Sequence, residues 1–171
     1  MNYEGGTRVV ALVNWPGHIS SGATFSEMMH VVDWFPTLAK LAGGSTAQCK
    51  PLDGLDVWPA LSEGKPSPRT EIVYNVEPFR AAVRQGDWKL VWRTVLPRSV
   101  ELYNIANDPS EKENLAAQHP EKVAALQQRV DELAAQAAKP LLLELGFKEL
   151  MHQYHLPPAF PGEELEFDQE Q

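Results

Sequence analysis

The stretch Arg80-Ala81-Ala82-Val83-Arg84-Gln85-Gly86-Asp87-Trp88-Lys89-Leu90-Val91-Trp92 predicts two β-strands joined by a tight turn. Short runs with β-branched and aromatic side chains lie on either side of the turn. Gln85-Gly86-Asp87 is a hairpin signal, because glycine supplies the positive φ that such turns require. Trp88 and Trp92 have the same parity on the second strand and therefore share one face. We favour a core position for both over stacking on a sugar.

The neighbouring segments extend this hairpin into an antiparallel meander. Residues 70–75 and 101–104 are further strand-like runs on either side of it. Residues 120–138 then predict an amphipathic helix, with a proline in the first turn and Pro140 beyond the end. Its apolar positions, spaced three or four residues apart, are Val123, Leu126, Val130, Leu133 and Ala137.

The N-terminal part has a different pattern. Residues 8–14 form a nearly continuous apolar run closed by Trp15-Pro16-Gly17, which is typical of a strand buried on both faces. A helix is expected to start at Asp33, whose carboxylate would cap free backbone N–H groups, with Pro36 in the first turn. The residues expected to face inward on this helix are Leu38, Leu41 and Ala42.

These patterns predict a mixed α/β fold, an α+β arrangement, in three parts. Residues 1–69 would hold the end of an α/β domain, including a proline-containing connection with one helical turn near residues 57–61. Residues 70–140 would form the small antiparallel sheet with its helix. Residues 141–171 would be an extension with one more helical segment and a frayed acidic tail. The acids of that tail are Glu163, Glu164, Glu166, Asp168 and Glu170.

Composition limits the possible partners. The formal net charge is −8, and no basic patch offsets it, which argues against binding to nucleic acid or to an anionic membrane. We expect neither a signal peptide nor a membrane anchor, because no apolar run approaches the required length. Cys49 is the single cysteine, so an internal disulfide and a multi-cysteine metal cage are excluded.

Three groups of residues invite a chemical interpretation. Cys49 could be a nucleophile or a modified side chain, but no neighbouring base activates it, and we favour a plain loop residue. His152 and His155 lie about one helical turn apart, but the prolines that follow argue against a metal site. Asp53 and Asp56 could offer oxygens to calcium, although a turn with local side-chain to backbone bonds is the interpretation that we favour.

Several longer motifs, in matching order and spacing, resemble the C-terminal half of formylglycine-dependent sulfatases over about residues 3 to 140. The arylsulfatase B branch, the N-acetylgalactosamine-4-sulfatase type, is the most similar. The motifs that carry the family resemblance are Glu4-Gly5-Gly6-Thr7-Arg8-Val9, Trp15-Pro16-Gly17, Asp33-Trp34-Phe35-Pro36-Thr37-Leu38, Leu102-Tyr103-Asn104-Ile105, Asp108-Pro109 and Glu113-Asn114-Leu115-Ala116. Those that carry the resemblance to the branch are residues 51–58, 62–69 and 81–90.

The resemblance implies an edge strand and helix of the sulfatase or alkaline-phosphatase-like sheet. It also implies an enzyme that hydrolyses sulfate esters with a formylglycine hydrate and a calcium ion, both carried by the N-terminal domain. The family nucleophile lies in a motif of Cys or Ser, any residue, Pro, any residue and Arg. Cys49 and Pro51 match its first half, but Asp53 stands where the arginine belongs. No catalytic or metal-binding residue is therefore transferred to this chain, and no cofactor is expected in it.

One position remains a candidate for substrate binding. Arg80 lies where the similar enzymes present a polar residue towards the substrate pocket; the alternative is an exposed arginine at a strand end. The expected function is that of a C-terminal arylsulfatase fragment, which covers the substrate cleft and is catalytically incomplete by itself. Its expected partner is the missing N-terminal sulfatase domain, and a sulfate ester would bind only to the full-length enzyme. Full-length relatives are usually exported, whereas no signal peptide is expected in this chain. The alternative is a standalone module that docks onto a separate sulfatase core.

Overall fold

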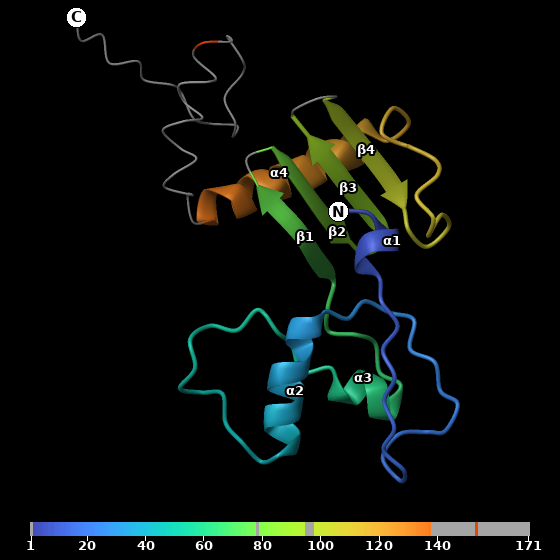
Figure 1. Cartoon of the computed structure of the whole chain (residues 1–171), viewed down its shortest axis with the longest axis vertical. Helices are drawn as coiled ribbons and strands as arrows, with labels where there is room; N and C mark the ends of the chain where they lie inside the picture. The colour runs from blue at the N-terminus through green and yellow to red at the C-terminus, as the bar shows by residue number, and fades with distance from the viewer. Residues whose placement is uncertain (1, 78, 95–97, 138–152, 154–171) are drawn as a thin grey trace, which may run out of the picture. The chain divides into compact units, whose positions relative to one another are not determined.

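The computed structural model describes residues 2–77, 79–94, 98–137 and 153. The chain forms two compact units, one of Arg8–Ile72 and one of Met1–Thr7 together with Val73–Gln171. Each unit is described by itself below (Figure 1). The expected helical segment near residues 141–154, the histidines at 152 and 155 and the acidic tail lie outside the described residues, apart from residue 153.

Four strands form one sheet in the order β1-β2-β3-β4. They are β1 (Glu71–Glu77), β2 (Arg80–Gln85), β3 (Trp88–Arg93) and β4 (Ser99–Asn104). β2 pairs antiparallel with β3, and β3 pairs antiparallel with β4. Gln85 lies opposite Trp88 at the turn between β2 and β3, where Gly86 has a φ of 54°. The predicted meander is confirmed, because its strand and turn signals are local in the sequence.

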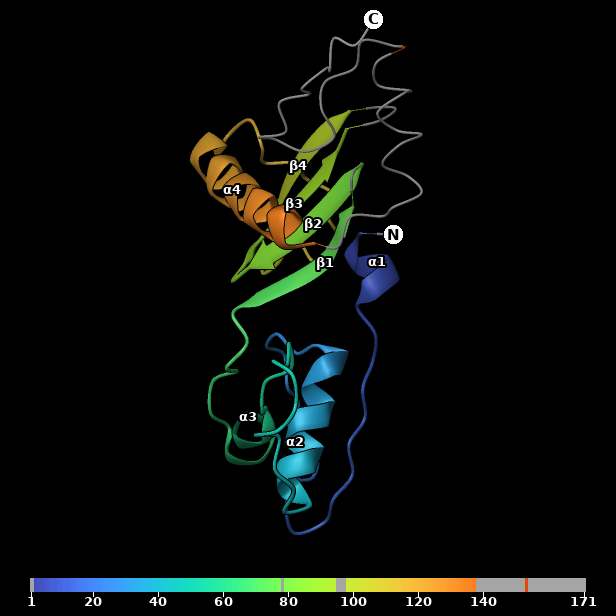
Figure 2. The same cartoon turned by 90° about the vertical axis from the view of Figure 1, so that its left-hand side faces the viewer.

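Helix α4 (Pro120–Gln136) lies across one face of this sheet (Figure 2). Its buried Leu126 and Val130 join a core cluster with the side chains that β2, β3 and β4 present to that face. Trp92 belongs to this cluster and the half-buried Trp88 packs against it, so the two tryptophans lie together in the core. The predicted helix is therefore confirmed, and so is its apolar stripe from Val123 to Leu133, whereas Ala137 is exposed and lies beyond the end of α4.

The opposite face of the sheet is covered by the first residues of the chain. A second core cluster there contains Ala82, Val91, Tyr103 and Ile105, with Tyr3 packed against it. The Gly-Gly motif forms the short helix α1 (Glu4–Thr7) on this face, opposite α4 (Figure 2). A six-residue N-terminal segment and a C-terminal helix therefore enclose the sheet between them.

The Arg8–Ile72 unit is built from short helices and connections. It contains η1 (Val31–Asp33), α2 (Trp34–Leu41) and α3 (Trp58–Glu63). α2 begins directly after Asp33 as predicted, and Gly43 follows its end with a φ of 75°. α3 matches the helical turn expected near residues 57–61. Among the described residues, no helix is both long and apolar enough to cross a membrane.

Two expectations for this unit are wrong. Residues 8–14 form no strand, and Val9, Val10 and Leu12 are 82%, 87% and 92% exposed. A strand that is apolar on both faces needs neighbouring strands and covering layers, and the described residues supply neither. On α2, Leu38 is 55% exposed and Ala42 beyond its end is exposed, so of the three residues expected to face inward only Leu41 is half-buried, whereas the polar Thr37 is buried.

Candidate functional site

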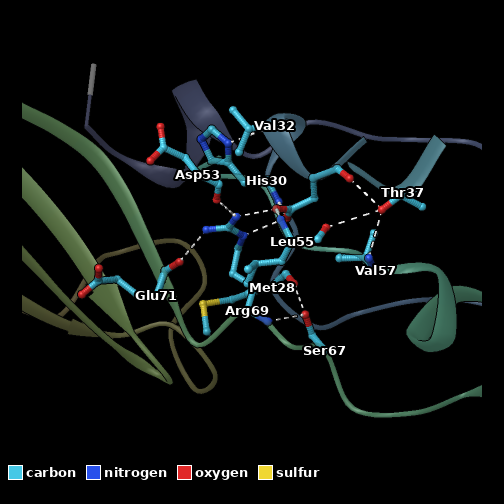
Figure 3. A network of polar contacts seen from close by, with 11 residues as sticks. Met28, His30, Val32, Thr37, Asp53, Leu55, Val57, Ser67, Arg69 and Glu71 are labelled. Atoms are coloured by element: carbon cyan, nitrogen blue, oxygen red, sulfur yellow. Dashed lines mark hydrogen bonds and ion pairs between the residues drawn. The ribbon is translucent and has the colours of Figure 1, made fainter. Parts of the chain in front are cut away.

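The side chain of Asp33 is the centre of a buried polar network in the Arg8–Ile72 unit (Figure 3). The Arg69 guanidinium binds both carboxylate oxygens, with Nε 2.7 Å from Oδ2 and Nη2 donating to Oδ1. The backbone N–H of Leu55 donates to Oδ1 at 2.8 Å, and that of His30 donates to Oδ2 at 2.8 Å. The carboxylate makes no capping bond to α2, so that part of the prediction is wrong. It completes the capping box of the preceding 3₁₀ helix instead.

Arg69 and Thr37 extend the network to the rest of the unit. Arg69 donates to the backbone oxygen of Asp53 at 2.8 Å and to that of Glu71 at 3.2 Å. The Thr37 hydroxyl donates to the backbone oxygen of Asp33 at 2.7 Å and accepts the N–H of Val57 at 3.0 Å. These bonds explain why Thr37 is buried while its apolar neighbours on α2 are not.

The contacts of Asp33 determine its charge state. Burial raises the pKa of its carboxyl, but hydrogen bonds from Arg69, His30 and Leu55 outweigh burial and hold the pKa below its usual range. The pKa of Arg69 is raised by the hydrogen bond to Asp33. Each Asp33 oxygen already accepts two donors, so the geometry suits a structural ion pair rather than a metal ligand or a general base.

A second buried cluster lies in the other unit, on the sheet face that α1 covers. Lys89 on β3 is fully buried, and its Nζ lies 2.8 Å from Glu4 Oε1 and 2.8 Å from Glu111 Oε1. The same Nζ is 3.9 Å from the ring centroid of Tyr74. The Tyr74 hydroxyl donates to Glu4 Oε1 at 2.7 Å. Burial raises the pKa of Glu4, but the bonds from Lys89 and Tyr74 outweigh burial and lower the pKa overall.

A smaller cluster surrounds Glu101 on the same unit. Its carboxylate accepts bonds from the hydroxyls of Tyr3 at 2.6 Å and Tyr103 at 2.9 Å, and from Arg93 at 2.7 Å. Burial and the Glu101 carboxylate raise the pKa of Tyr3 to about 12, and they raise the pKa of Tyr103 as well. Both hydroxyls therefore stay protonated near neutral pH, which does not suit a nucleophile or a base.

In the part of the chain that the structure describes, Cys49, Asp53 and Asp56 contribute no side-chain hydrogen bond to these clusters. Cys49 is exposed. The carboxylate of Asp56 accepts the N–H of Trp58 at 3.0 Å and pairs with Lys40 at 2.7 Å. Asp53 contributes its backbone oxygen to Arg69. The part of the chain that the structure describes holds no group of three potential metal-ligating side chains.

Arg80 is the first residue of β2, and its side chain is 47% exposed. Its Nε lies 2.8 Å from Glu77 Oε2. This contact raises the pKa of Arg80 and lowers that of Glu77. The guanidinium is charged and open to solvent, and its role towards a substrate stays a prediction.

The sequence analysis missed the Lys89 cluster. Parity placed Lys89 on the face opposite Trp88 and Trp92, where a lysine suggests solvent. The sequence did contain one indication: Glu4, the acidic residue before the two glycines, is a possible partner for Lys89, and a lysine is rarely buried unless it is paired.

Comparisons with known proteins identify the class of this molecule. The family model of the N-sulphoglucosamine sulphohydrolase C-terminal domain matches residues 1–138. The chain therefore belongs to this family of sulfatase C-terminal domains. It is 35% identical to arylsulfatase J of Mus musculus over 103 residues, which are 58% of this chain and 17% of the relative. It is 34% identical to arylsulfatase A of Homo sapiens over 155 residues, which are 74% of this chain and 30% of the relative. The chain thus spans less than a third of the length of these curated relatives.

Solved structures agree on the fold. Ps i-CgsB superposes with a TM-score of 0.60 at 27% identity, over 70% of this chain and 27% of that protein. It has also been solved with k-i-k-neocarrahexaose. A protein solved with its substrate D-glucosamine-2-N,6-O-disulfate superposes with a TM-score of 0.55 at 25% identity, over 71% of this chain and 27% of that protein.

The described residues do not fit the calcium ion and the formylglycine that the resemblance implies for whole sulfatases. The buried carboxylates of Asp33, Glu4 and Glu111 are engaged by Arg69 and Lys89. The sequence around Cys49 lacks the arginine of the nucleophile motif.

Proposed function

We propose that this sulfatase C-terminal domain completes an arylsulfatase by docking onto a catalytic α/β domain, where it walls and covers the substrate cleft. The family match over residues 1–138 carries the proposal, because the same residues make up less than a third of relatives such as arylsulfatase A. The nucleophile, the calcium ion and the sulfate-binding side chains would belong to the catalytic domain. The chain by itself would then be catalytically incomplete.

The exposed apolar segment supports this docking. Residues 8–14 are apolar on both sides, and the side chains of Val9, Val10 and Leu12 are almost entirely exposed in the chain alone. Such a segment is suited to a sheet that is covered on both faces. We propose that residues 8–14 pair with the edge of the catalytic domain's sheet and that α2 covers the same sheet. Residues 1–69 would act as this edge and residues 70–140 as the cover, with residues 141–171 as an extension.

The assignment of the chain to a particular branch of the arylsulfatases is also a proposal. Residues 51–58, 62–69 and 81–90 favour the arylsulfatase B type, which acts on N-acetylgalactosamine-4-sulfate groups. Arg80 would then face the sulfated sugar. Its guanidinium is half exposed at the start of β2 and would exchange its contact with Glu77 for the anionic ligand.

The first test is an activity assay of the isolated chain on a chromogenic aryl sulfate with added calcium. We expect no turnover, because the described residues do not assemble a nucleophile beside a cation. Hydrolysis that copurifies with the chain would contradict the proposal.

The second test restores the missing part. The chain would be coexpressed with an arylsulfatase truncated before its matching region. We expect the two to copurify and aryl sulfate turnover to return, and Val10→Lys with Leu12→Lys should abolish both effects. Ala47→Lys with Gln48→Lys adds the same charge at exposed positions and should preserve them. A sharp thermal transition of the isolated chain without dye uptake would favour the alternative, a closed standalone module.

A further inference from the structure

Residues 2–7, called the strap here, lie on the sheet face opposite α4. Tyr3 packs against Ala82, Val91 and Tyr103 in the cluster on this face. The strap is tied to residues far along the chain, since the Glu4 backbone N–H donates to Glu111 Oε2 at 2.6 Å. Within the strap, the Gly6 N–H donates to the backbone oxygen of Tyr3 at 2.9 Å.

A lysine beneath the strap is unexpected on a packed sheet face. Lys89 is the second residue of the inner strand β3, paired with Arg84 on one side and Tyr103 on the other, and it is fully buried. A buried ammonium group is costly unless anions compensate it. Two carboxylates do so here, one from the strap and one from the loop after β4. If the strap left, Lys89 would lose one of its two counter-ions and its cover.

The second carboxylate is held in a constrained backbone. Glu111 is the one non-glycine residue with positive φ, at 53°, among the described residues. The Asp108 carboxylate fixes its loop by accepting the N–H groups of Lys112 at 2.7 Å and Glu113 at 2.9 Å. A left-handed non-glycine residue persists only where its surroundings enforce it, and here it aims a carboxylate at both Lys89 and the strap backbone.

We propose that Lys89 is the docking residue for the strap, so that this sheet face accepts a chain segment only in the register that brings a carboxylate to the ammonium group. Glu4 supplies that carboxylate, and Glu111 receives the strap backbone beside it. The Tyr3 hydroxyl holds one end of the strap to Glu101, but Gly5 and Gly6 offer no side chain, so Glu4 is the residue that fixes the register of the rest. This inference rests on contacts within one compact unit and does not depend on sulfatase activity.

The test is amide hydrogen exchange of the full chain, read at Glu4 and Gly6. In the wild-type chain both amides should be protected. Glu4→Gln keeps the shape of the side chain and removes its charge, and Lys89→Met removes the cation. We expect each to lower strap protection on the order of 100-fold, because Glu4→Gln removes the one counter-ion of Lys89 that the strap supplies and Lys89→Met leaves two buried carboxylates without their cation. The β3 amides should retain most of their protection, since the sheet and α4 remain packed.

A charge exchange separates pairing from packing. Glu4→Lys alone and Lys89→Glu alone place like charges together, whereas the double variant restores one cation between two anions. We expect the double variant to recover at least about tenfold of the protection that the worse single variant loses. The control is Lys40→Met, which removes an exposed pair with Asp56 and should leave the strap unchanged.

Two results would overturn the proposal. One is wild-type protection at Glu4 and Gly6 no greater than that of an unstructured peptide while β3 is protected. The other is a Glu4→Gln chain whose strap is protected as in the wild type. The first measurement needs no variant and Glu4→Gln leaves Lys89 in place, so the proposal can be overturned even if Lys89 variants fail to fold.

Discussion

At the residue scale, the two buried ion pairs show how charge organises a small core. Asp33 accepts four hydrogen bonds from three separate stretches of the Arg8–Ile72 unit. A buried pair of this kind contributes little compared with an apolar replacement, but the loss of one partner leaves a desolvated charge. Replacing Asp33 should therefore lower the free energy of unfolding by far more than the ion pair itself contributes to it.

Asp33→Asn should lower the free energy of unfolding by about 3 kcal/mol, because Arg69 would lose its buried counter-ion. Urea denaturation followed by tryptophan fluorescence measures this loss. Lys40→Met removes an exposed ion pair and should change the free energy of unfolding far less than Asp33→Asn does. Equal losses in the two variants would contradict the structural role of Asp33.

The same residue gives a pH dependence. The pKa of Asp33 is lower in the folded chain, so its stabilising effect is complete above the unfolded pKa of about 4 and fades as pH falls through the folded value. The stability difference between the wild type and Asp33→Asn should thus be constant from pH 5 to 7 and shrink in stronger acid. A difference that grew on acidification would contradict this sign.

At the element scale, the helices of the Arg8–Ile72 unit are short, and the connection around Gly54 packs closely against them. A Cβ at Gly54 would lie 2.2 Å from the Val32 oxygen and 3.0 Å from Pro36 Cδ, so the connection touches the start of α2 directly. Its neighbours Asp53 and Leu55 bond to Arg69 and Asp33. Glycine is required here by space rather than by backbone angle.

Gly54→Ala should therefore destabilise the Arg8–Ile72 unit by about 1–3 kcal/mol, because a backbone oxygen must move. Gly5→Ala is the matched control, since a Cβ there meets nothing within 4 Å. We expect the control to lie within about 0.5 kcal/mol of the wild type in the same denaturation measurement. A Gly54→Ala chain as stable as the wild type would show that Val32 and Pro36 move aside at little cost in free energy.

The elements predicted from the sequence were those with local signals. β2, β3 and α4 follow from a hairpin glycine and a helical apolar stripe. The strand at residues 8–14 failed because a strand exists only with a pairing partner, which lies outside the sequence pattern. Lys89 and Asp33 were missed as ion-pair centres because their partners lie 85 and 36 residues away.

At the scale of the whole molecule, the exposed apolar side chains predict self-association. Val9, Val10 and Leu12 form a two-sided apolar segment that pairs with no strand among the described residues, and such a segment favours contact between chains. Val10→Lys with Leu12→Lys should reduce the associated fraction in sedimentation velocity at least about twofold without changing unfolding by more than about 0.5 kcal/mol.

The control for this change is Ala47→Lys with Gln48→Lys, which adds two charges and removes little apolar surface. It should leave most of the association in place. Equal effects of the two double variants would attribute association to net charge rather than to residues 8–14.

The sheet and its strap also impose an order on biosynthesis. Glu4 contacts Glu111, 107 residues later, and Tyr3 contacts Glu101, 98 residues later. Tyr3 and Glu4 must therefore remain without these partners until the 107 residues up to Glu111 have been translated. At elongation rates of about 5–20 residues per second, this interval lasts on the order of several seconds. During this time the glycines of the strap serve a further purpose, because a segment with little side chain to misplace is a poor target for premature collapse.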